Sequence, residues 1–263
     1  MLSYEKLGRC KLQYLTSNPV VRTEEILIAN LKETIVTLVG ELSLLDPRKR
    51  VFGAQRSSSA WGHNYHFNKP LGVTVVQQFE KRHGIQLPDD YREFVTQVGD
   101  GGAGPYYGVK PLADAGKYSN LAASFPWSCE ITLSTDAEWD VWESLPGVLA
   151  ISERGCAQAD VLIVNGAPYG QIWSDLTAAD CPLSRSHDSF LDWYVSWAEG
   201  CIATIKREPL IELVSVGMTI DKLKEILGPN IDRWDSTADL PDSPTYYVGF
   251  ENTNASFAMD HND

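Results

Sequence analysis

Apolar side chains recur every three to four positions in several stretches of the chain, which is the spacing of one face of a helix. The pattern predicts helices at 23–45, 73–83 and 188–206, and a further helix that begins at Pro88. Gly84 is expected to end the helix before Pro88. Gly99 directly follows the apolar stripe of the Pro88 helix, where a left-handed cap needs glycine.

Short apolar runs bounded by polar and turn residues predict the strands of a sheet. They lie at 130–134, 148–152, 161–164 and 171–174. The run VLIV at 161–164 does not alternate with polar residues, so both faces of this strand should be buried. The loop after it begins Asn165-Gly166, a dipeptide typical of hairpins.

Five glycines lie between Gly99 and Gly108. A phosphate-binding loop joins a strand to the start of a helix, so that main-chain N–H groups point at the anion. This loop instead follows the end of a helix, and it lacks a Gly-Lys-Ser/Thr ending. We therefore interpret it as a sharp turn that leads into a strand at 106–111, and not as a nucleotide site.

The end of the chain has a pattern of its own. A strand is expected at 210–216, and Thr219 can cap a short helix at 220–227, with strands at 245–250 and 255–259. The sequence therefore predicts three parts. These are an N-terminal helical extension and loop at 1–69, a central domain at 70–206 and a small C-terminal strand–helix–strand unit at 207–263.

The formal net charge of -13 disfavours direct binding to nucleic acid and favours a basic partner. The five cysteines form no C-x-x-C pair and are odd in number, which argues against a zinc ribbon and a disulfide framework. No apolar run reaches the roughly 18 residues of a membrane span, and the N-terminus lacks a signal-peptide core. We expect a cytoplasmic protein without membrane contact.

Motifs that would indicate an enzyme are missing from the sequence. There is no G-x-S-x-G elbow and no H-E-x-x-H motif. His63 and His66 form an H-x-x-H pair without a recognisable third ligand, so we interpret them as surface histidines. Asp175 and Asp180 show no spacing that indicates acid–base chemistry. The sequence predicts no catalytic residue, no cofactor and no metal site.

An acidic and aromatic segment at 136–143 stands out instead. Tryptophan and tyrosine are favoured anchors in protein interfaces, and neighbouring acids select a basic partner. The alternative is that Trp139 or Trp142 belongs to the core and that the acids are solvated around it. The candidate partner-binding residues are Asp100, Tyr106, Tyr107, Asp136, Glu138, Trp139, Asp140, Trp142, Glu143 and Asp175.

Several motifs occur in an order that is typical of one known family. Leu87-Pro88 with Tyr91 and Phe94 precedes the glycine-rich turn, and an apolar strand then leads to Gly155-Cys156. Further along come Asp160, Gly166, Gly170 with Trp173, and Ser189-Phe190 with Trp193 and Trp197. Together they resemble the SUKH superfamily of the Smi/Knr type, over about 71–206.

The resemblance implies an α+β fold with a mixed, mostly antiparallel sheet flanked by helices, and no enzyme activity. Bacterial members are commonly immunity proteins that bind and neutralise a cognate polymorphic toxin. Because the chain is acidic, we expect a basic toxin such as a nuclease, inhibited by occlusion of its active site. One alternative is a non-catalytic regulatory or scaffold protein that binds an endogenous partner. Another is a hydrolase or a metal-dependent enzyme that uses His63, His66 or the carboxylates.

Overall fold

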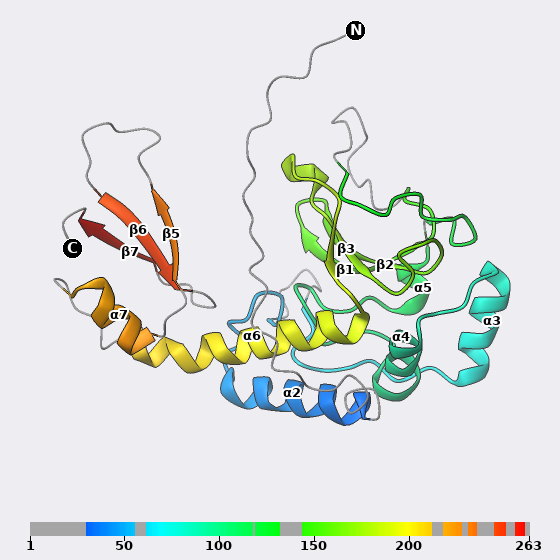
Figure 1. Ribbon diagram of the computed structural model, residues 1–263. Helices are drawn as coiled ribbons and strands as arrows, with labels where there is room; N and C mark the ends of the chain where they lie inside the picture. The colour runs from blue at the N-terminus through cyan, green and yellow to red at the C-terminus, as the bar shows by residue number, and fades with distance from the viewer. Residues whose placement is uncertain are drawn as a thin grey trace, which may run out of the picture. The chain divides into compact units, whose positions relative to one another are not determined.

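The computed structural model describes residues 30–55, 62–117, 119–131, 144–211, 218–227, 231–235, 245–250 and 256–260 (Figure 1). The chain forms two compact units that interleave along the sequence. The first comprises Met1–Thr34, Phe67–Gly101 and Val109–Trp193, and the second comprises Ile35–His66, Gly102–Gly108 and Tyr194–Asp263. None of the helices in the described residues is both long and apolar enough to span a bilayer. The expected division into three parts stays a prediction.

The first unit contains α3 (Val73–His83) and α4 (Asp89–Glu93). As expected, α3 ends at Gly84, which is left-handed and donates its N–H to the carbonyl of Glu80. The Glu80 carboxylate accepts a hydrogen bond from the main-chain N–H of Leu87, at 2.9 Å, and pairs with Arg92 of α4. This one buried side chain therefore fixes the connection between the two helices.

The helix that begins after Pro88 does not end as expected. It changes to a π-helix, η1 (Phe94–Val98), in which the N–H of Gly99 reaches the carbonyl of Phe94 at 3.0 Å. Gly99 is extended, with φ -179, so the prediction of a left-handed cap is wrong. Glycine is needed here for space, because a Cβ atom would lie 2.7 Å from the carbonyl oxygen of Asn68.

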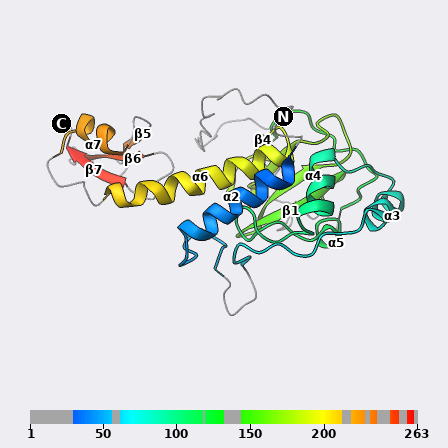
Figure 2. The same cartoon turned by 90° about the horizontal axis from the view of Figure 1, so that it is seen from below.

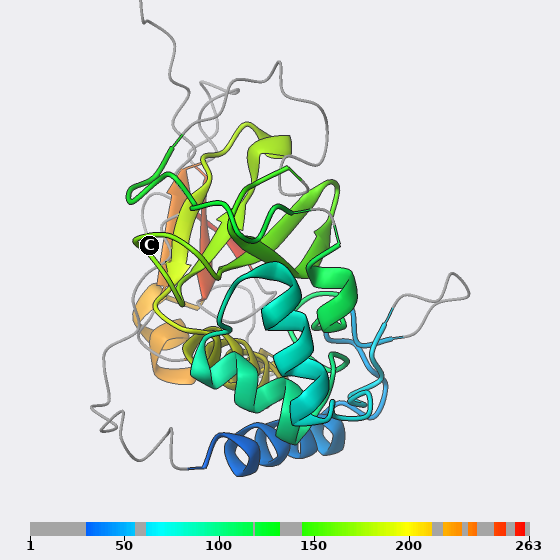
Figure 3. The same cartoon turned by 90° about the vertical axis from the view of Figure 1, so that its right-hand side faces the viewer.

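Four strands form a meander in which every neighbouring pair is antiparallel. They are β1 (Val148–Gly155), β2 (Gln158–Ile163), β3 (Ile172–Asp175) and β4 (Ser184–His187), in that order across the sheet. The helices α3, α4 and α5 (Leu112–Ala115) gather below the sheet in Figures 1 and 3. The α+β fold with a mostly antiparallel sheet is confirmed, and a parallel bridge joins Phe125 to Gly166.

One face of this sheet carries an apolar core that the loop before β1 completes. Phe125 from the loop lies edge-on to Trp173 of β3, with ring centroids 5.1 Å apart. The buried members of the cluster are Phe125, Leu145, Val148, Ala150, Ala159, Val161, Ile163, Trp173 and Leu183. Alternate residues of β1 and β2 point into it, which is the period expected of strands.

One further expected strand is wrong, and another lies largely outside the described residues. Residues 106–111 contain a turn and an isolated bridge, and α5 begins directly after them, so that prediction is wrong. Of 130–134, Ile131 forms an antiparallel bridge with Leu183, and the residues after it lie outside the described part. In contrast, the runs that predicted β1, β2 and β3 are confirmed, whereas β4 was not predicted because it has no apolar residue.

The second unit contains most of α2 (Leu31–Leu45) and of α6 (Phe190–Ile211). The two helices lie side by side in Figures 1 and 2, and Lys206 pairs with Glu41 at 2.7 Å. Asp46 follows α2 and folds the next residues into a turn. Its carboxylate accepts hydrogen bonds from the N–H groups of Arg50 and Val51, each at 2.9 Å, and from the Tyr65 hydroxyl at 2.8 Å.

The C-terminal part contains α7 (Ile220–Leu227), with Thr219 as its predicted cap. After it, β5 (Ile231–Asp235), β6 (Thr245–Phe250) and β7 (Ser256–Asp260) form an antiparallel sheet in that order. The helix and the strands expected at 245–250 and 255–259 are therefore confirmed, whereas β5 was not predicted. The strand expected at 210–216 is wrong at its start, because α6 runs to Ile211, and 212–216 lie outside the described residues.

Candidate functional site

A buried polar cluster lies on the face of the β1–β4 sheet opposite the apolar core. Asp160 of β2 is fully buried, and its Oδ1 accepts hydrogen bonds from Arg154 at 2.6 Å and from the Ser174 hydroxyl at 2.8 Å. Its Oδ2 accepts one from the Trp193 indole N–H at 3.1 Å. Both oxygens of the carboxylate therefore accept hydrogen bonds, which connect β1, β2 and β3 to the start of α6. This environment favours a structural role for Asp160 over a role as a base or nucleophile.

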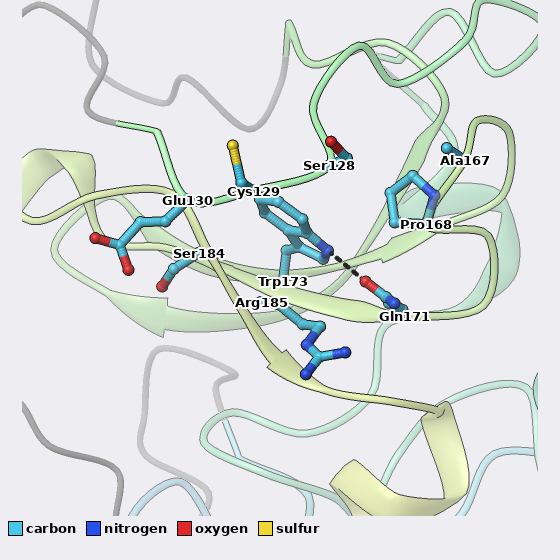
Figure 4. Close-up of a pocket in the computed structure, with 9 residues that line it drawn as sticks. All are labelled: Ser128, Cys129, Glu130, Ala167, Pro168, Gln171, Trp173, Ser184 and Arg185. Carbon is cyan, nitrogen blue, oxygen red and sulfur yellow. Dashed lines mark hydrogen bonds between the residues drawn. The ribbon is translucent and has the colours of Figure 1, made fainter.

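A pocket of about 450 Å³ opens at the edge of the same sheet, beside β4 (Figure 4). This volume is within the roughly 300–1,000 Å³ of typical ligand sites. Its lining residues come from the loop before β1, the β2–β3 loop, β3 and β4. They are Ser128, Cys129, Glu130, Ala167, Pro168, Gln171, Trp173, Ser184 and Arg185.

Trp173 forms the floor of the pocket. Trp173 packs in the apolar core, and its indole N–H donates a hydrogen bond to the Gln171 side chain at 3.2 Å, drawn as a dashed line in Figure 4. The walls carry both signs of charge. Arg185 is already paired with Asp188 at 2.7 Å, whereas no partner of the exposed Glu130 carboxylate is found in the described residues.

This pocket can bind polar groups but shows no reactive constellation. Cys129 is exposed and forms no disulfide with another described cysteine. Among the residues that the structure describes, no group of three or more His, Cys, Asp or Glu side chains could hold a metal ion. The residues that line the pocket offer hydrogen-bonding groups and charges of both signs.

A second candidate surface is an aromatic cluster in the other unit, made of Phe52, Tyr106 and Tyr107. The Phe52 ring lies 6.3 Å from that of Tyr106 and 5.2 Å from that of Tyr107, and its side chain is 57% exposed. The two loops touch through their backbones, since a Cβ on Gly53 would overlap the Tyr106 carbonyl. Tyr106 itself has φ +53, a conformation that bulky residues rarely adopt.

The predicted partner-binding residues have different environments. Tyr106 and Tyr107 are half-buried in the aromatic cluster. Asp100 accepts the N–H of Leu112 at 2.7 Å, and burial raises the pKa of its carboxyl. Asp175 is fully buried and accepts the Thr177 hydroxyl at 2.6 Å. The positions that lie outside the described residues are Asp136, Glu138, Trp139, Asp140, Trp142 and Glu143. The assignment of all these residues to an interface stays a prediction.

Only one of the two histidines lies at the surface, so the expectation of a surface residue is wrong for His63. His66 is exposed, but His63 is buried and lies edge-on to Trp197, with ring centroids 6.0 Å apart. Its Nδ1 accepts the main-chain N–H of Tyr65 at 3.0 Å. Burial, together with the nearby His66, lowers the pKa of His63 to about 4, so the ring is neutral at pH 7.

With this geometry established, comparison with known proteins adds one match. The model of the SMI1 / KNR4 family (SUKH-1) matches residues 71–196. Residues 71–196 form a SUKH-superfamily domain. The match confirms the resemblance found in the motifs, and the SUKH domain contains the β1–β4 sheet, the Asp160 cluster and the pocket. Neither a curated protein nor a solved structure gave a significant match to the chain.

Three residues of these surfaces were not predicted. Phe52 and Arg185 lie in segments without apolar periodicity, and Glu130 begins the strand predicted at 130–134, where nothing distinguishes it from an ordinary solvent-exposed acid. For Phe52 the available signal was composition, because Arg48-Lys49-Arg50-Val51-Phe52 places an aromatic ring two positions after a run of three cations in an otherwise acidic chain.

Proposed function

We propose that this protein is an immunity protein, which binds a cognate polymorphic toxin in the cytoplasm and neutralises it by covering its active site. The observation that carries the proposal is the SUKH domain at 71–196, since bacterial domains of this type commonly serve in toxin immunity. In this mechanism the chain performs no chemistry and needs no cofactor. Inhibition requires that the complex lasts longer than the time in which the free toxin would reach its substrate.

Two properties of the chain support a basic toxin as the partner. The net charge of -13 attracts a cationic protein over a long range and increases the rate of encounter. A nuclease must present a basic active site to its substrate, so an acidic surface can occupy that site in place of phosphate groups. The exposed Phe52, with Tyr106 and Tyr107, offers the kind of aromatic anchor that dominates binding energy in interfaces.

The test is to express the product of the adjacent upstream gene with and without this protein, and to measure growth and co-purification. We expect that the upstream product alone stops growth, and that co-expression restores growth through a stable complex. A harmless upstream product that does not co-purify would contradict the proposal. It would favour the regulatory or scaffold function, for which the partner is sought by pull-down from the native host.

A further inference from the structure

A gap, called the wedge below, lies between residues 128–130 and residues 184–185 of β4 at the edge of the sheet. Ile131 and Leu183 exchange two main-chain hydrogen bonds, at 2.9 and 3.0 Å, so the chain before β1 runs antiparallel to the start of β4 at this point. Continuing that register would place Cys129 opposite Arg185. The bridge is isolated, however, and the pocket separates the two segments instead (Figure 4).

Main-chain groups of β4 face this wedge. In an antiparallel strand, the N–H and C=O of successive residues point alternately to the two sides. The main-chain N–H and C=O of Leu183 point away from β3, because both form hydrogen bonds with Ile131. The pairs Ser174–Ser184 and Trp173–Arg185 follow without a register shift. The N–H and C=O of Arg185 therefore face outward, and among the strands that the structure describes β4 is the last of its sheet. These are the groups that an added strand uses.

The charges in the wedge indicate which strand it accepts. Arg185 is already paired with Asp188, so its attraction for an incoming acid is reduced. The exposed carboxylate of Glu130 has no hydrogen bond or ion pair to any other described residue and lines the opposite wall. A cationic side chain on the incoming strand would neutralise it.

We infer that an extended, basic segment of the toxin adds to β4 as a fifth strand, with the main chain of Arg185 as its pairing partner and a Lys or Arg side chain against Glu130. This inference rests on the proposed function and specifies how the toxin is held. Main-chain hydrogen bonds supply affinity, and the Glu130 carboxylate supplies selectivity for a basic segment.

The experiment uses the full chain and the purified product of the upstream gene. Hydrogen–deuterium exchange of the free protein and of the complex should show new protection of the Arg185 amide. Arg185→Pro removes an outward N–H without removing a ladder bond, since proline is tolerated on edge strands. It should weaken binding about tenfold. Arg185→Ala keeps the main-chain donor and should weaken binding less.

Glu130→Gln should weaken binding about fivefold, and the loss should decrease at high salt because a charge pair is removed. The matched control is Asp180→Asn, which removes one exposed negative charge from a residue with φ +56, a conformation that asparagine tolerates. It should bind as the parent protein does. Melting temperatures of all four variants identify any loss of folding, and Glu130→Gln tests the wedge even if the proline variant does not fold.

The outcomes separate the two proposals. If no complex forms with the upstream product, both the immunity function and its toxin strand are wrong. If a complex forms while Arg185 stays unprotected and Glu130→Gln binds as tightly as the parent, the function stands and the added strand is wrong. Protection of Arg185 together with weakened binding by Glu130→Gln supports both.

Discussion

Asp160 accepts hydrogen bonds from Arg154, Ser174 and Trp193 inside the SUKH domain, and each of these donors is largely buried. Removing one partner of a buried ion pair typically costs about 3–5 kcal/mol, because the remaining groups lose their acceptor without gaining water. We therefore expect Asp160→Ala to lower the free energy of unfolding by about 3 kcal/mol or more, measured by urea denaturation.

Asp188→Ala is the matched control, because it breaks the exposed Arg185–Asp188 pair of the same domain. Exposed pairs contribute about 0–1 kcal/mol, so this variant should unfold close to the parent protein. Equal losses in the two variants would mean that the Asp160 cluster does not hold the domain together.

His63 should make stability dependent on pH. Its pKa is lowered to about 4 in the folded protein, against 6.5 as the ordinary value, so between these values the unfolded chain binds the extra proton. Stability is therefore present above pH 6.5 and is lost as the pH falls towards 4. A difference of about 2.5 pKa units corresponds to about 3 kcal/mol.

The free energy of unfolding, measured at several pH values, checks this. His63→Asn keeps an acceptor for the N–H of Tyr65 but does not titrate in this range, so its stability should fall less from pH 6.5 to 4. His66→Asn changes an exposed ring and should retain most of the dependence. The same slope in the parent and in His63→Asn would contradict the assignment.

At the scale of elements, the junction after η1 depends on the absence of a side chain at Gly99. A Cβ atom there would lie 2.7 Å from the carbonyl oxygen of Asn68 and 2.8 Å from the Cβ of Phe67. Such overpacking costs about 1–3 kcal/mol, so Gly99→Ala should lower the melting temperature.

Gly40→Ala is expected to have the opposite effect. Gly40 is exposed within α2, and a Cβ atom there would meet nothing within 4 Å. Alanine in an exposed helix position is about 0.5–1 kcal/mol more stable than glycine. A higher melting temperature for Gly40→Ala and a lower one for Gly99→Ala would separate steric need from helix propensity, and the reverse order would refute this account.

Elements with clear periodicity were predictable from the sequence. α3 has the expected bounds, and β1, β2 and β3 follow apolar runs because both sheet faces are covered. β4 was missed, since Ser184-Arg185-Ser186-His187 has no apolar residue and is a strand only because β3 supplies hydrogen bonds. The steric role of Gly99 was also missed, because the atoms that leave no room for a side chain there belong to Phe67 and Asn68, which are distant in sequence.

The candidate surfaces were less predictable than the fold. Tyr106 and Tyr107 were chosen as aromatic residues in a turn, but the ring that joins them, Phe52, comes from a loop about fifty positions earlier. Likewise, the pocket brings Glu130 together with Arg185 through the sheet. Such proximity depends on strand order and register, which no local pattern contains.

At the scale of the whole molecule, the net charge of -13 should determine the rate of association with the proposed basic toxin. Association rates that depend on long-range attraction fall steeply with ionic strength. We expect the association rate constant, measured by stopped flow, to fall about tenfold or more from low salt to 0.5 M salt. A rate that does not change with salt would contradict an electrostatic encounter.

Charge reversal tests whether the acidic segment at 136–143 directs that encounter. Glu138→Lys with Asp140→Lys should slow association more than the double variant Asp114→Lys with Glu199→Lys, which changes the net charge equally at two exposed positions. Equal slowing would show that net charge matters and that the segment has no special role.

The composition of β4 affects whether copies of the free protein pair with one another. An open sheet edge invites identical molecules to pair with one another, which leads to aggregates. β4 is only four residues long, contains an arginine, and is interrupted by a register shift opposite Ile172 and Trp173. These features discourage pairing between the β4 edges of two copies of the protein, which would lead to aggregates.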